Sequence, residues 1–504
     1  MLRLLILEIN SHGPEGIKDL RHAGLNHERT NIMKIQFTII CFISCLALSL
    51  SHRVAAGEPA PNIVFVLFDD MGYGQPQSYN AKSTLRTPNL DKLATQGMRF
   101  TDAHSGAAVC TPTRYGVLTG RYPSRLGQFG VLTTFSKPII PAGRMTVASM
   151  LKRQGYATAC IGKWHLGMDW VDGKPGTEKQ VPIGAKMTGG PNDLGFDYFC
   201  GFTHARNIGT IIEQDRVATH IEPVDNQPLM LTKAIQWIDQ RKASEPFFLY
   251  FPLGIPHEPI VPSADFIGKS GSQDLVKQDP KYGDWLFQGD AMLGKLIEAL
   301  DRNKLADNTL ILVTSDNGAE HRAYEPLRES KRSIYEGGHR VPFIARWPNK
   351  VMPGSVNNHT ICLNDLMATA AEIAGAKIPV NAGEDSISLI PELLGTTTNG
   401  ARDATVHQSA AGDLAIRQGP WKLVFLKNGQ RELYNLHADL SETQDVLAAN
   451  EDIATKLTTL MQGYIASGRS TVGPPQKNDF DLSFTGENKV KPKQKKQDAK
   501  AVSK

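Results

Sequence analysis

The run NIVFVLF, residues 62–68, ends at Asp69-Asp70, and the run TLILVT, residues 309–314, ends at Ser315-Asp316-Asn317-Gly318. Apolar runs rich in β-branched residues, without polar alternation, are typical of strands covered on both faces in a largely parallel sheet. Ligands of such sheets gather beyond the carboxyl ends of the strands, where both polar groups lie. The two runs therefore predict an α/β fold with a binding site at one edge of its sheet.

The rest of the chain fits this fold class. Helical periodicity is found in residues 89–96, 147–154, 229–241, 289–303 and 363–374, and FFLYF, residues 247–251, predicts another strand. After about residue 391 the pattern changes to short strand-like pieces at 414–417, 421–425 and 432–434, followed by a helix over 452–466. We expect an N-terminal extension (1–56), a main α/β domain (57–390), a small C-terminal α+β domain (391–473), and a linker with a basic tail (474–504).

Composition and charge exclude several classes of protein. With 41% hydrophobic and 21% charged residues in 504, the chain is neither wholly disordered nor a multi-span membrane protein. The formal net charge is +4, but residues 489–504 alone carry seven Lys against one Asp, so the remaining chain is net acidic. A nucleic-acid-binding protein would instead spread its basic residues over a folded face. The tail is expected to be solvated, with a weak tether to an acidic surface as the alternative.

The N-terminal region predicts export. Met33-Lys34 precedes an apolar stretch, residues 37–50, that is too short to span a bilayer, and Val54-Ala55-Ala56 offers small residues for cleavage. This indicates a signal peptide starting at Met33, no stable membrane span, and a secreted or periplasmic protein. A lipid anchor at Cys45 is a weaker alternative, and residues 1–32 raise the hypothesis that Met33 is the true start.

Cysteine usage fits an exported protein without a disulfide framework. Four cysteines remain after the signal segment: Cys110, Cys160, Cys200 and Cys362. Four in so long a chain allow one bridge at most, so stability must come from the core.

The most specific motif is Cys110-Thr111-Pro112-Thr113-Arg114, followed by Leu118-Thr119-Gly120-Arg121. Alone, Cys-x-Pro-x-Arg could equally be a buried Cys before a turn. Together the two strings resemble the sulfatase signature. The resemblance implies that a formylglycine-generating enzyme oxidises Cys110 to an aldehyde, which hydrates to a gem-diol. One hydroxyl would attack sulfur, and the other would then collapse to the aldehyde and expel sulfate.

The acidic groups at the two strand ends suit a hard metal ion. Asp69, Asp70, Asp316 and Asn317 offer three carboxylates and an amide oxygen, which Ca²⁺ or Mg²⁺ prefers. Taken alone, each pair is more often a strand-end turn or a helix cap. The resemblance implies that these residues, with the modified Cys110, bind the metal, Ca²⁺ ahead of Mg²⁺, and that the ion polarises sulfate oxygens.

Two further blocks resemble the family and supply basic groups. Gly162-Lys163-Trp164-His165-Leu166-Gly167 carries a Lys and a His two residues apart, which an extended segment would point to the same side. The resemblance implies that Lys163 binds sulfate and that His165 contacts the diol and accepts a proton. Pro256-His257-Glu258-Pro259 implies His257 as general acid on the leaving alcohol.

The remaining block is Lys331, five residues before Glu336-Gly337-Gly338. By itself Lys331 sits in a charge run, residues 328–332, that would normally be a solvated face. The resemblance implies that Lys331 contacts sulfate beside the leaving group. It also implies that Arg114 pairs with the diol and the metal site.

Six blocks in the family's order, together with Leu433-Tyr434-Asn435-Leu436 in a tail similar to that of sulfatases, extend the resemblance over about residues 61–470. It implies an alkaline-phosphatase-like fold, a mixed, mostly parallel sheet between helices with a smaller C-terminal α+β domain. The expected activity is hydrolysis of sulfate esters on sulfated glycans. The alternatives are a phosphonate or phosphate ester hydrolase of the same superfamily and a catalytically silent glycan-binding protein.

The leaving group is expected to be read by residues around the pocket. The candidates are His204, Arg206, Asp215-Arg216 and residues 321–328, whose positive charges would suit an anionic polysaccharide. Overall resemblance suggests a 6-sulfated galactose or N-acetylgalactosamine unit.

Overall fold

The computed structural model describes residues 60–272, 279–320 and 322–482. The predicted signal segment and basic tail lie outside these residues. Within the described residues, none of the helices is both long and apolar enough to cross a membrane.

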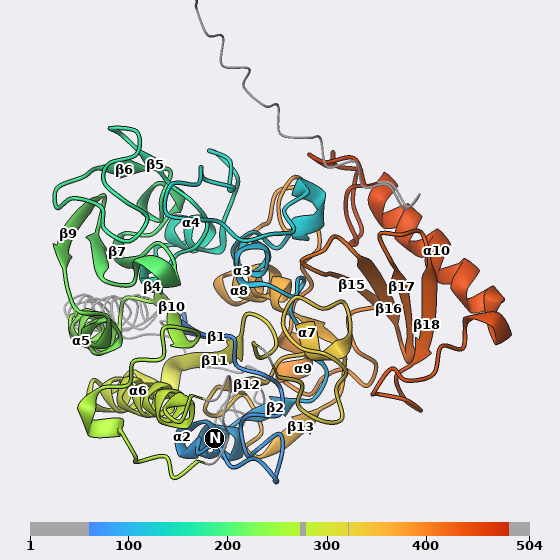
Figure 1. Cartoon of the computed structure of the whole chain (residues 1–504), viewed down its shortest axis with the longest axis horizontal. Helices are drawn as coiled ribbons and strands as arrows, with labels where there is room; N and C mark the ends of the chain where they lie inside the picture. Colours follow the sequence, from blue (N-terminus) through green and yellow to red (C-terminus); the bar gives the residue numbers. More distant parts are fainter. Residues whose placement is uncertain (1–59, 273–278, 321, 483–504) are drawn as a thin grey trace, which may run out of the picture. The chain divides into compact units, whose positions relative to one another are not determined.

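A mixed sheet forms the centre of the described chain (Figure 1). Its inner strands β11, β1, β10, β4 and β7 are all parallel, whereas β12 and β8 run antiparallel to their neighbours. This confirms the predicted mixed, mostly parallel sheet. In the described residues the ten strands follow the order β13 (Ser355–Asn357), β2 (Met98–Phe100), β12 (Phe343–Arg346), β11 (Thr309–Ser315), β1 (Asn62–Asp69), β10 (Phe247–Pro256), β4 (Ala157–Lys163), β7 (Tyr198–Phe202), β8 (Thr210–Glu213) and β9 (Arg216–His220).

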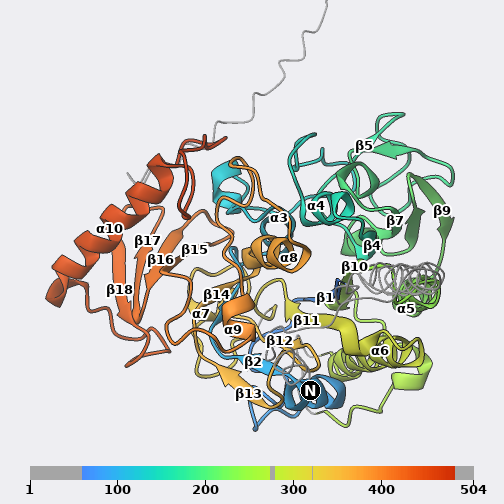
Figure 2. The same ribbon diagram turned by 180° about the vertical axis from the view of Figure 1, so that it is seen from behind.

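Both faces of this sheet are covered, as the unbroken apolar runs require. Along β1, Ile63, Phe65 and Leu67 enter one hydrophobic core, and the alternate residues of the strand enter another. Helices lie on both sides of the sheet (Figures 1 and 2). The first core is covered by α3 (Cys110–Thr119), α4 (Val147–Arg153) and α8 (Leu366–Ala374), and the second by α2 (Pro88–Gln96), α5 (Asn226–Asp239) and α6 (Tyr282–Arg302).

The predicted elements are present, with some boundaries shifted. The largest shift is at α6, which begins at Tyr282 and not at residue 289. Its first turns hide a polar residue, Asp284, whose carboxylate accepts hydrogen bonds from the backbone N–H groups of Gly268 and Ser270. A buried polar residue with such partners breaks the apolar period that the prediction relied on.

A second, smaller sheet follows near the C-terminus. It is an antiparallel meander of β15 (Ala404–Gln408), β16 (Leu414–Gln418), β17 (Trp421–Phe425) and β18 (Arg431–Asn435). Helix α10 (Glu451–Ala466) packs on one face, where Leu457 and Met461 join Ile416 and Leu423 in a separate core. The small α+β region is therefore confirmed, and β15 is a strand that the sequence pattern did not reveal.

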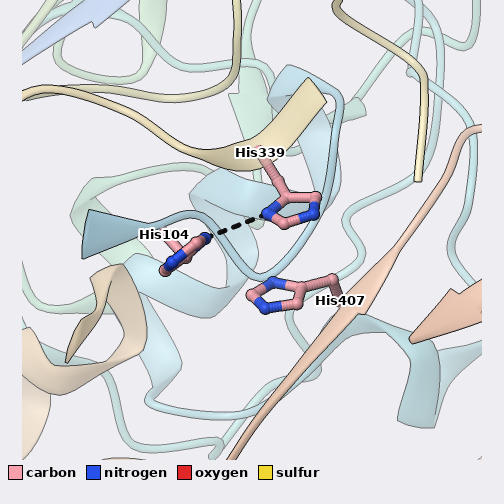
Figure 3. A group of neighbouring side chains, drawn as sticks. All are labelled: His104, His339 and His407. Carbon is pink, nitrogen blue, oxygen red and sulfur yellow. Dashed lines mark hydrogen bonds between the residues drawn. The ribbon is translucent and has the colours of Figure 1, made fainter. Parts of the chain in front are cut away.

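The small sheet meets the preceding part of the described chain at three neighbouring histidines, here called the histidine cluster (Figure 3). His104 on β3 (Ala103–His104), His339 on α7 (Glu336–His339) and His407 on β15 are all buried. The Nδ1 atoms of His104 and His339 are 3.1 Å apart, and the rings of His339 and His407 stack with centroids 3.9 Å apart. Beyond β3, the backbone N–H of Ala108 donates to the carbonyl oxygen of Gln408 at 2.9 Å, so β15 also holds the loop before α3.

The four cysteines of the described chain, Cys110, Cys160, Cys200 and Cys362, are buried and free. Stability of this part of the chain therefore comes from its cores, as expected.

Candidate active site

Cys110 is the first residue of α3, and its side chain is buried. Pro112 suits the first turn of a helix, because the N–H groups there have no partner within the helix. Thr113 Oγ1 donates to the carbonyl oxygen of Ala107 at 2.8 Å and so fixes the loop that enters the helix. Burial raises the pKa of the Cys110 thiol. An unmodified Cys110 would therefore be a weak thiolate nucleophile at neutral pH.

Three carboxylates meet at the strand ends, as the sequence predicts. Strands β1 and β11 pair in parallel with Phe68 opposite Ser315, which places Asp69 and Asp70 beside Asp316. Asp70 has a φ of 73°, a conformation rarely adopted by non-glycine residues. Its backbone N–H donates to Asp316 Oδ1 at 3.1 Å. The strained turn thus brings two strand ends to one point, as is common at functional sites.

Arg114 lies between these carboxylates, one helical turn after Cys110. Its Nη2 is 2.7 Å from Asp316 Oδ2 and 3.2 Å from Asp69 Oδ1, and all three side chains are fully buried. Burial raises the pKa of Asp316 to about 7, and repulsion from Asp69 adds to the rise. Burial would also raise the pKa of Asp69, but Lys163, His257 and Arg114 hold it well below its usual range. Asp69 is therefore already stabilised by its cations, whereas Asp316 is the carboxylate that additional positive charge would stabilise.

The residues at the strand ends fit a hard divalent ion. The Asn317 side-chain amide donates to Asp70 Oδ1 at 2.7 Å and to the Gly318 carbonyl at 2.9 Å, so its Oδ1 is the free acceptor. That atom is buried and has no hydrogen-bond partner. Ligand atoms of Asp69, Cys110 and Asp316 also lie within 4.8 Å of one another. A set of oxygen ligands with an unpartnered amide oxygen matches the preference of Ca²⁺ or Mg²⁺.

Two buried lysines form ion pairs with the carboxylates of Asp69 and Asp70. Lys163 Nζ donates to Asp69 Oδ2 at 2.6 Å, and Lys331 Nζ donates to Asp70 Oδ2 at 2.7 Å. The structure therefore places Lys331 in the site and not on the solvated face that its charge run would suggest. Lysines held this way stand beside any anion that approaches Cys110.

His165 reaches the site by a different route from the one predicted. Strand β4 ends at Lys163, and His165 has a φ of 57°, so the side-by-side placement does not come from alternation along an extended segment. His165 Nε2 is 3.0 Å from the carbonyl oxygen of Leu132, which can only accept. Nε2 therefore carries the hydrogen, and Nδ1 is an acceptor that is buried without a partner. Burial, with the charge of Lys163, lowers the pKa of His165 and keeps this acceptor unprotonated.

His257 is more open, with 22% of its side chain exposed. Its Nδ1 donates to the carbonyl oxygen of Glu258 at 2.6 Å, which leaves Nε2 facing Asp70 Oδ2 at 3.7 Å. Burial lowers the pKa of His257, although Asp70 and Asp69 oppose the shift. Nε2 is the ring atom that could exchange a proton with a leaving group.

A cavity of about 920 Å³ lies above these side chains. Of the predicted catalytic residues, the structure brings five to its wall: Cys110, Lys163, His165, His257 and Lys331. Arg114 and the predicted metal ligands Asp69, Asp316 and Asn317 are buried beneath them.

The rim differs in part from the prediction. His204 and Arg206 line the cavity, but Asp215, Arg216 and the described residues of 322–328 do not, and His321 lies outside the described residues. The wall is completed by residues that no sequence pattern singled out, among them Leu132, Lys179, Glu320 and Arg332. They were missed because no family motif includes them, although Glu320 follows Gly318 by two residues and Arg332 directly follows Lys331.

Family models match most of the described chain. The model described as Sulfatase matches residues 61–376, and the model described as N-sulphoglucosamine sulphohydrolase, C-terminal, matches residues 320–467. The two matches cover both the main sheet and the small C-terminal sheet.

Individual proteins give the same result. The chain is 31% identical over 489 residues to the N-acetylgalactosamine-6-O-sulfatase of Bacteroides thetaiotaomicron, covering 80% of this chain and 92% of that one. It is 33% identical over 422 residues to human arylsulfatase A, covering 76% and 78%. A solved Bacteroides thetaiotaomicron protein, from work on the metabolism of multiple glycosaminoglycans, superposes with a TM-score of 0.72 at 28% identity, covering 81% and 99%.

Proposed function

Because this chain belongs to the sulfatase family, whose members hydrolyse sulfate esters, we propose that its substrates are sulfated glycans and that a formylglycine made from Cys110 attacks sulfur. The fold is the alkaline-phosphatase-like fold of sulfatases. One observation carries the proposal: a single cavity collects Cys110, Lys163, His165, His257 and Lys331 from four separate segments of the chain.

The nucleophile is the hydrated aldehyde. One hydroxyl of the gem-diol attacks sulfur, and the second later restores the aldehyde and expels sulfate, without attack of water on a stable ester. Ca²⁺, with Mg²⁺ as the weaker alternative, would be held by Asp69, Asp70, Asp316 and Asn317 with the modified Cys110, and would polarise the sulfate oxygens.

The side chains around the nucleophile have matching roles. His165 Nδ1, a free acceptor, takes the proton of the second hydroxyl during sulfate release. Lys163 and Lys331 neutralise sulfate oxygens, and Arg114 holds the carboxylates in place. In its doubly protonated form, which Asp70 Oδ2 at 3.7 Å stabilises, His257 donates the Nε2 proton to the leaving alcohol, which departs poorly as an alkoxide. Electrostatic stabilisation dominates, because the transferring group stays negative throughout.

The substrate class rests on the rim and on the relatives. Lys179, Arg206 and Arg332 add positive charge to the cavity wall, which suits an anionic polysaccharide. One relative is named an N-acetylgalactosamine-6-O-sulfatase. We therefore propose a 6-sulfated galactose or N-acetylgalactosamine unit as the residue that is desulfated.

Two further parts of the proposal concern the maturation of the chain and its export. A formylglycine-generating enzyme is the required partner, because Cys110 must be oxidised before the nucleophile exists. Export to the periplasm or the medium is proposed from the signal-like residues 33–56, where sulfated polysaccharides would be met.

The decisive experiment is peptide mass spectrometry across Cys110, on protein produced with a formylglycine-generating enzyme. The mass loss that accompanies conversion of a thiol to an aldehyde supports the proposal, and an unmodified thiol in active protein overturns it. Rates on matched aryl sulfate and aryl phosphate esters then test the reaction class. A preference for the phosphate would replace sulfate ester hydrolysis with phosphoester hydrolysis.

A further inference from the structure

A carboxylate outside the family motifs faces the lysine expected to bind sulfate. Glu320 Oε2 lies 2.8 Å from Lys331 Nζ, and Glu320 Oε1 pairs with the guanidinium of Arg332. The Lys331 side chain is 2% exposed and that of Arg332 is 56% exposed, and all three residues line the cavity. Glu320 thus connects a buried and an exposed cation on one wall.

The backbone fixes this arrangement. The N–H of Lys331 donates to the carbonyl oxygen of Ala319 at 3.0 Å, which places Lys331 beside Glu320. The N–H of Arg332 donates to the carbonyl oxygen of Ala108 at 2.7 Å, which ties the same segment to the loop before Cys110. Arg332 has a φ of 79°, a costly conformation for a non-glycine residue. Two residues that are neighbours in sequence therefore both reach one carboxylate.

The position of Glu320 affects the charge that a sulfate group meets. Lys331 Nζ also donates to Asp70 Oδ2 at 2.7 Å, but Asp70 belongs to the proposed metal site. Glu320 is a second counter-charge for Lys331, outside that ligand set. Because charges interact more strongly in a partly buried cavity than in water, a carboxylate there weakens the attraction of Lys331 and Arg332 for another anion.

A weaker attraction is useful for a sulfatase. Inorganic sulfate carries the same oxygens as the group transferred from the substrate, so any cation that binds the ester also retains the product. Binding that is equal for substrate, transition state and product does not accelerate the chemical step.

Resting on the proposed sulfatase function, we propose that Glu320 is a positioning residue that holds Lys331 and Arg332 against the cavity wall and limits the affinity of the site for released sulfate. It acts through its contacts with Lys331 and Arg332.

The test compares Glu320→Gln with Glu320→Asp in the mature, metal-loaded enzyme. The probe is inorganic sulfate, measured by titration calorimetry and as an inhibitor of aryl sulfate hydrolysis. The Gln variant keeps the shape and removes the charge, so we expect sulfate to bind about tenfold tighter, with a lower KM. The Asp variant keeps the charge and should stay within about twofold of the wild type. Unchanged or weaker sulfate binding by the Gln variant overturns the proposal, because a purely structural role of Glu320 predicts that result.

A second variant, Arg332→Gln, can be used for the test if Glu320→Gln does not fold. Arg332→Gln removes a cation from the wall and leaves the full charge of Glu320 on Lys331, so sulfate binding should weaken by about threefold to tenfold. An unchanged sulfate affinity in that variant contradicts the proposal. If the wild type neither binds sulfate nor cleaves aryl sulfate, the proposed function itself is refuted. If sulfate inhibits the wild type and Glu320→Gln equally, only this inference is refuted.

Discussion

Two buried polar clusters in this protein have similar compositions but differ in whether they adjoin the cavity. The active-site cluster, the candidate site built on Asp69, Asp316 and Arg114, lies under a cavity and contains acceptors without partners at Asn317 Oδ1 and His165 Nδ1. The histidine cluster lies between β3, α7 and β15, and none of its three histidines lines the described cavity.

The charged groups around the histidine cluster are paired, although His407 Nε2 is also buried without a hydrogen-bond partner. Asp102 binds His104 Nε2 at 2.8 Å and the guanidinium of Arg340 at 3.3 Å, and Glu336 binds Lys422 Nζ at 3.1 Å. Paired charges away from a cavity hold segments together, whereas open acceptors facing a cavity are available for chemistry.

Three neighbouring histidines could also suggest a transition-metal site, but their geometry opposes it. The rings of His339 and His407 are stacked, with an interplanar angle of 9° and centroids 3.9 Å apart. A metal ion bound by imidazole lies near the plane of each ring, and one ion cannot lie in two stacked parallel planes. The cluster is therefore a packed group of neutral rings, in which one of the facing Nδ1 atoms of His104 and His339 carries the shared hydrogen.

The largest effect is expected from Cys110→Ala. Removing the nucleophile should reduce turnover of an aryl sulfate by about a thousandfold or more, while the melting temperature stays within a few degrees of the wild type. Steady-state kinetics and calorimetry measure the two quantities. Normal activity would show that the reaction does not use Cys110.

Metal removal should affect both activity and stability. Chelation is expected to abolish aryl sulfate hydrolysis and to lower the melting temperature by a few degrees, because the clustered carboxylates lose a bound cation. Adding back Ca²⁺ should restore both. A chelated enzyme of unchanged melting temperature and activity would contradict a metal site at the strand ends.

His257→Ala tests the proposed role of His257 in the active-site cluster. Loss of a general acid should cost about a hundredfold or more on an alkyl or glycan sulfate, and much less on a nitrophenyl sulfate, whose alcohol leaves without a proton. The measurement is kcat for both substrate types. Equal losses would remove the acid role of His257.

The histidine cluster should set part of the acid limit of stability. Burial lowers the pKa values of His104, His339 and His407, so the unfolded chain binds more protons below about pH 6.5. Stability is therefore full above that pH and is lost as the pH falls, by about 1.4 kcal/mol per unit for each histidine.

The His407→Phe variant tests this acid limit. Between pH 6.5 and 5 it should reduce the slope of the free energy of unfolding against pH by about the contribution of one histidine. The control His437→Phe, at an exposed position, should leave the slope unchanged. Denaturant unfolding at several pH values measures the slope, and equal slopes for wild type and His407→Phe would refute the role.

The smallest effect separates the predicted rim from the observed one. Arg206→Gln removes a charge from the cavity wall and should raise KM for a sulfated glycan by about threefold. Arg216→Gln, at an exposed position outside the wall, should change KM by less than about twofold. A larger rise in KM for Arg216→Gln than for Arg206→Gln would favour the rim predicted from the sequence.

The sequence by itself determined the parts that depend on local pattern and exact residue type. The runs at 62–68 and 309–314 predicted buried parallel strands, and the polar residues after them predicted where a site would lie. Motifs placed Cys110, Lys163, His257 and Lys331 in one site before their distances were known, and the structure brings them together.

Only the tertiary structure decided which charges are buried and paired. Lys331 and Arg332 are neighbours in one charge run, yet one side chain is 2% exposed and the other 56%. His104, His339 and His407, far apart along the chain, carry no local signal of their contact. Whether a polar group is solvated, paired or left open depends on the neighbours that folding brings to it, and these neighbours come from distant segments whose contacts no local pattern specifies.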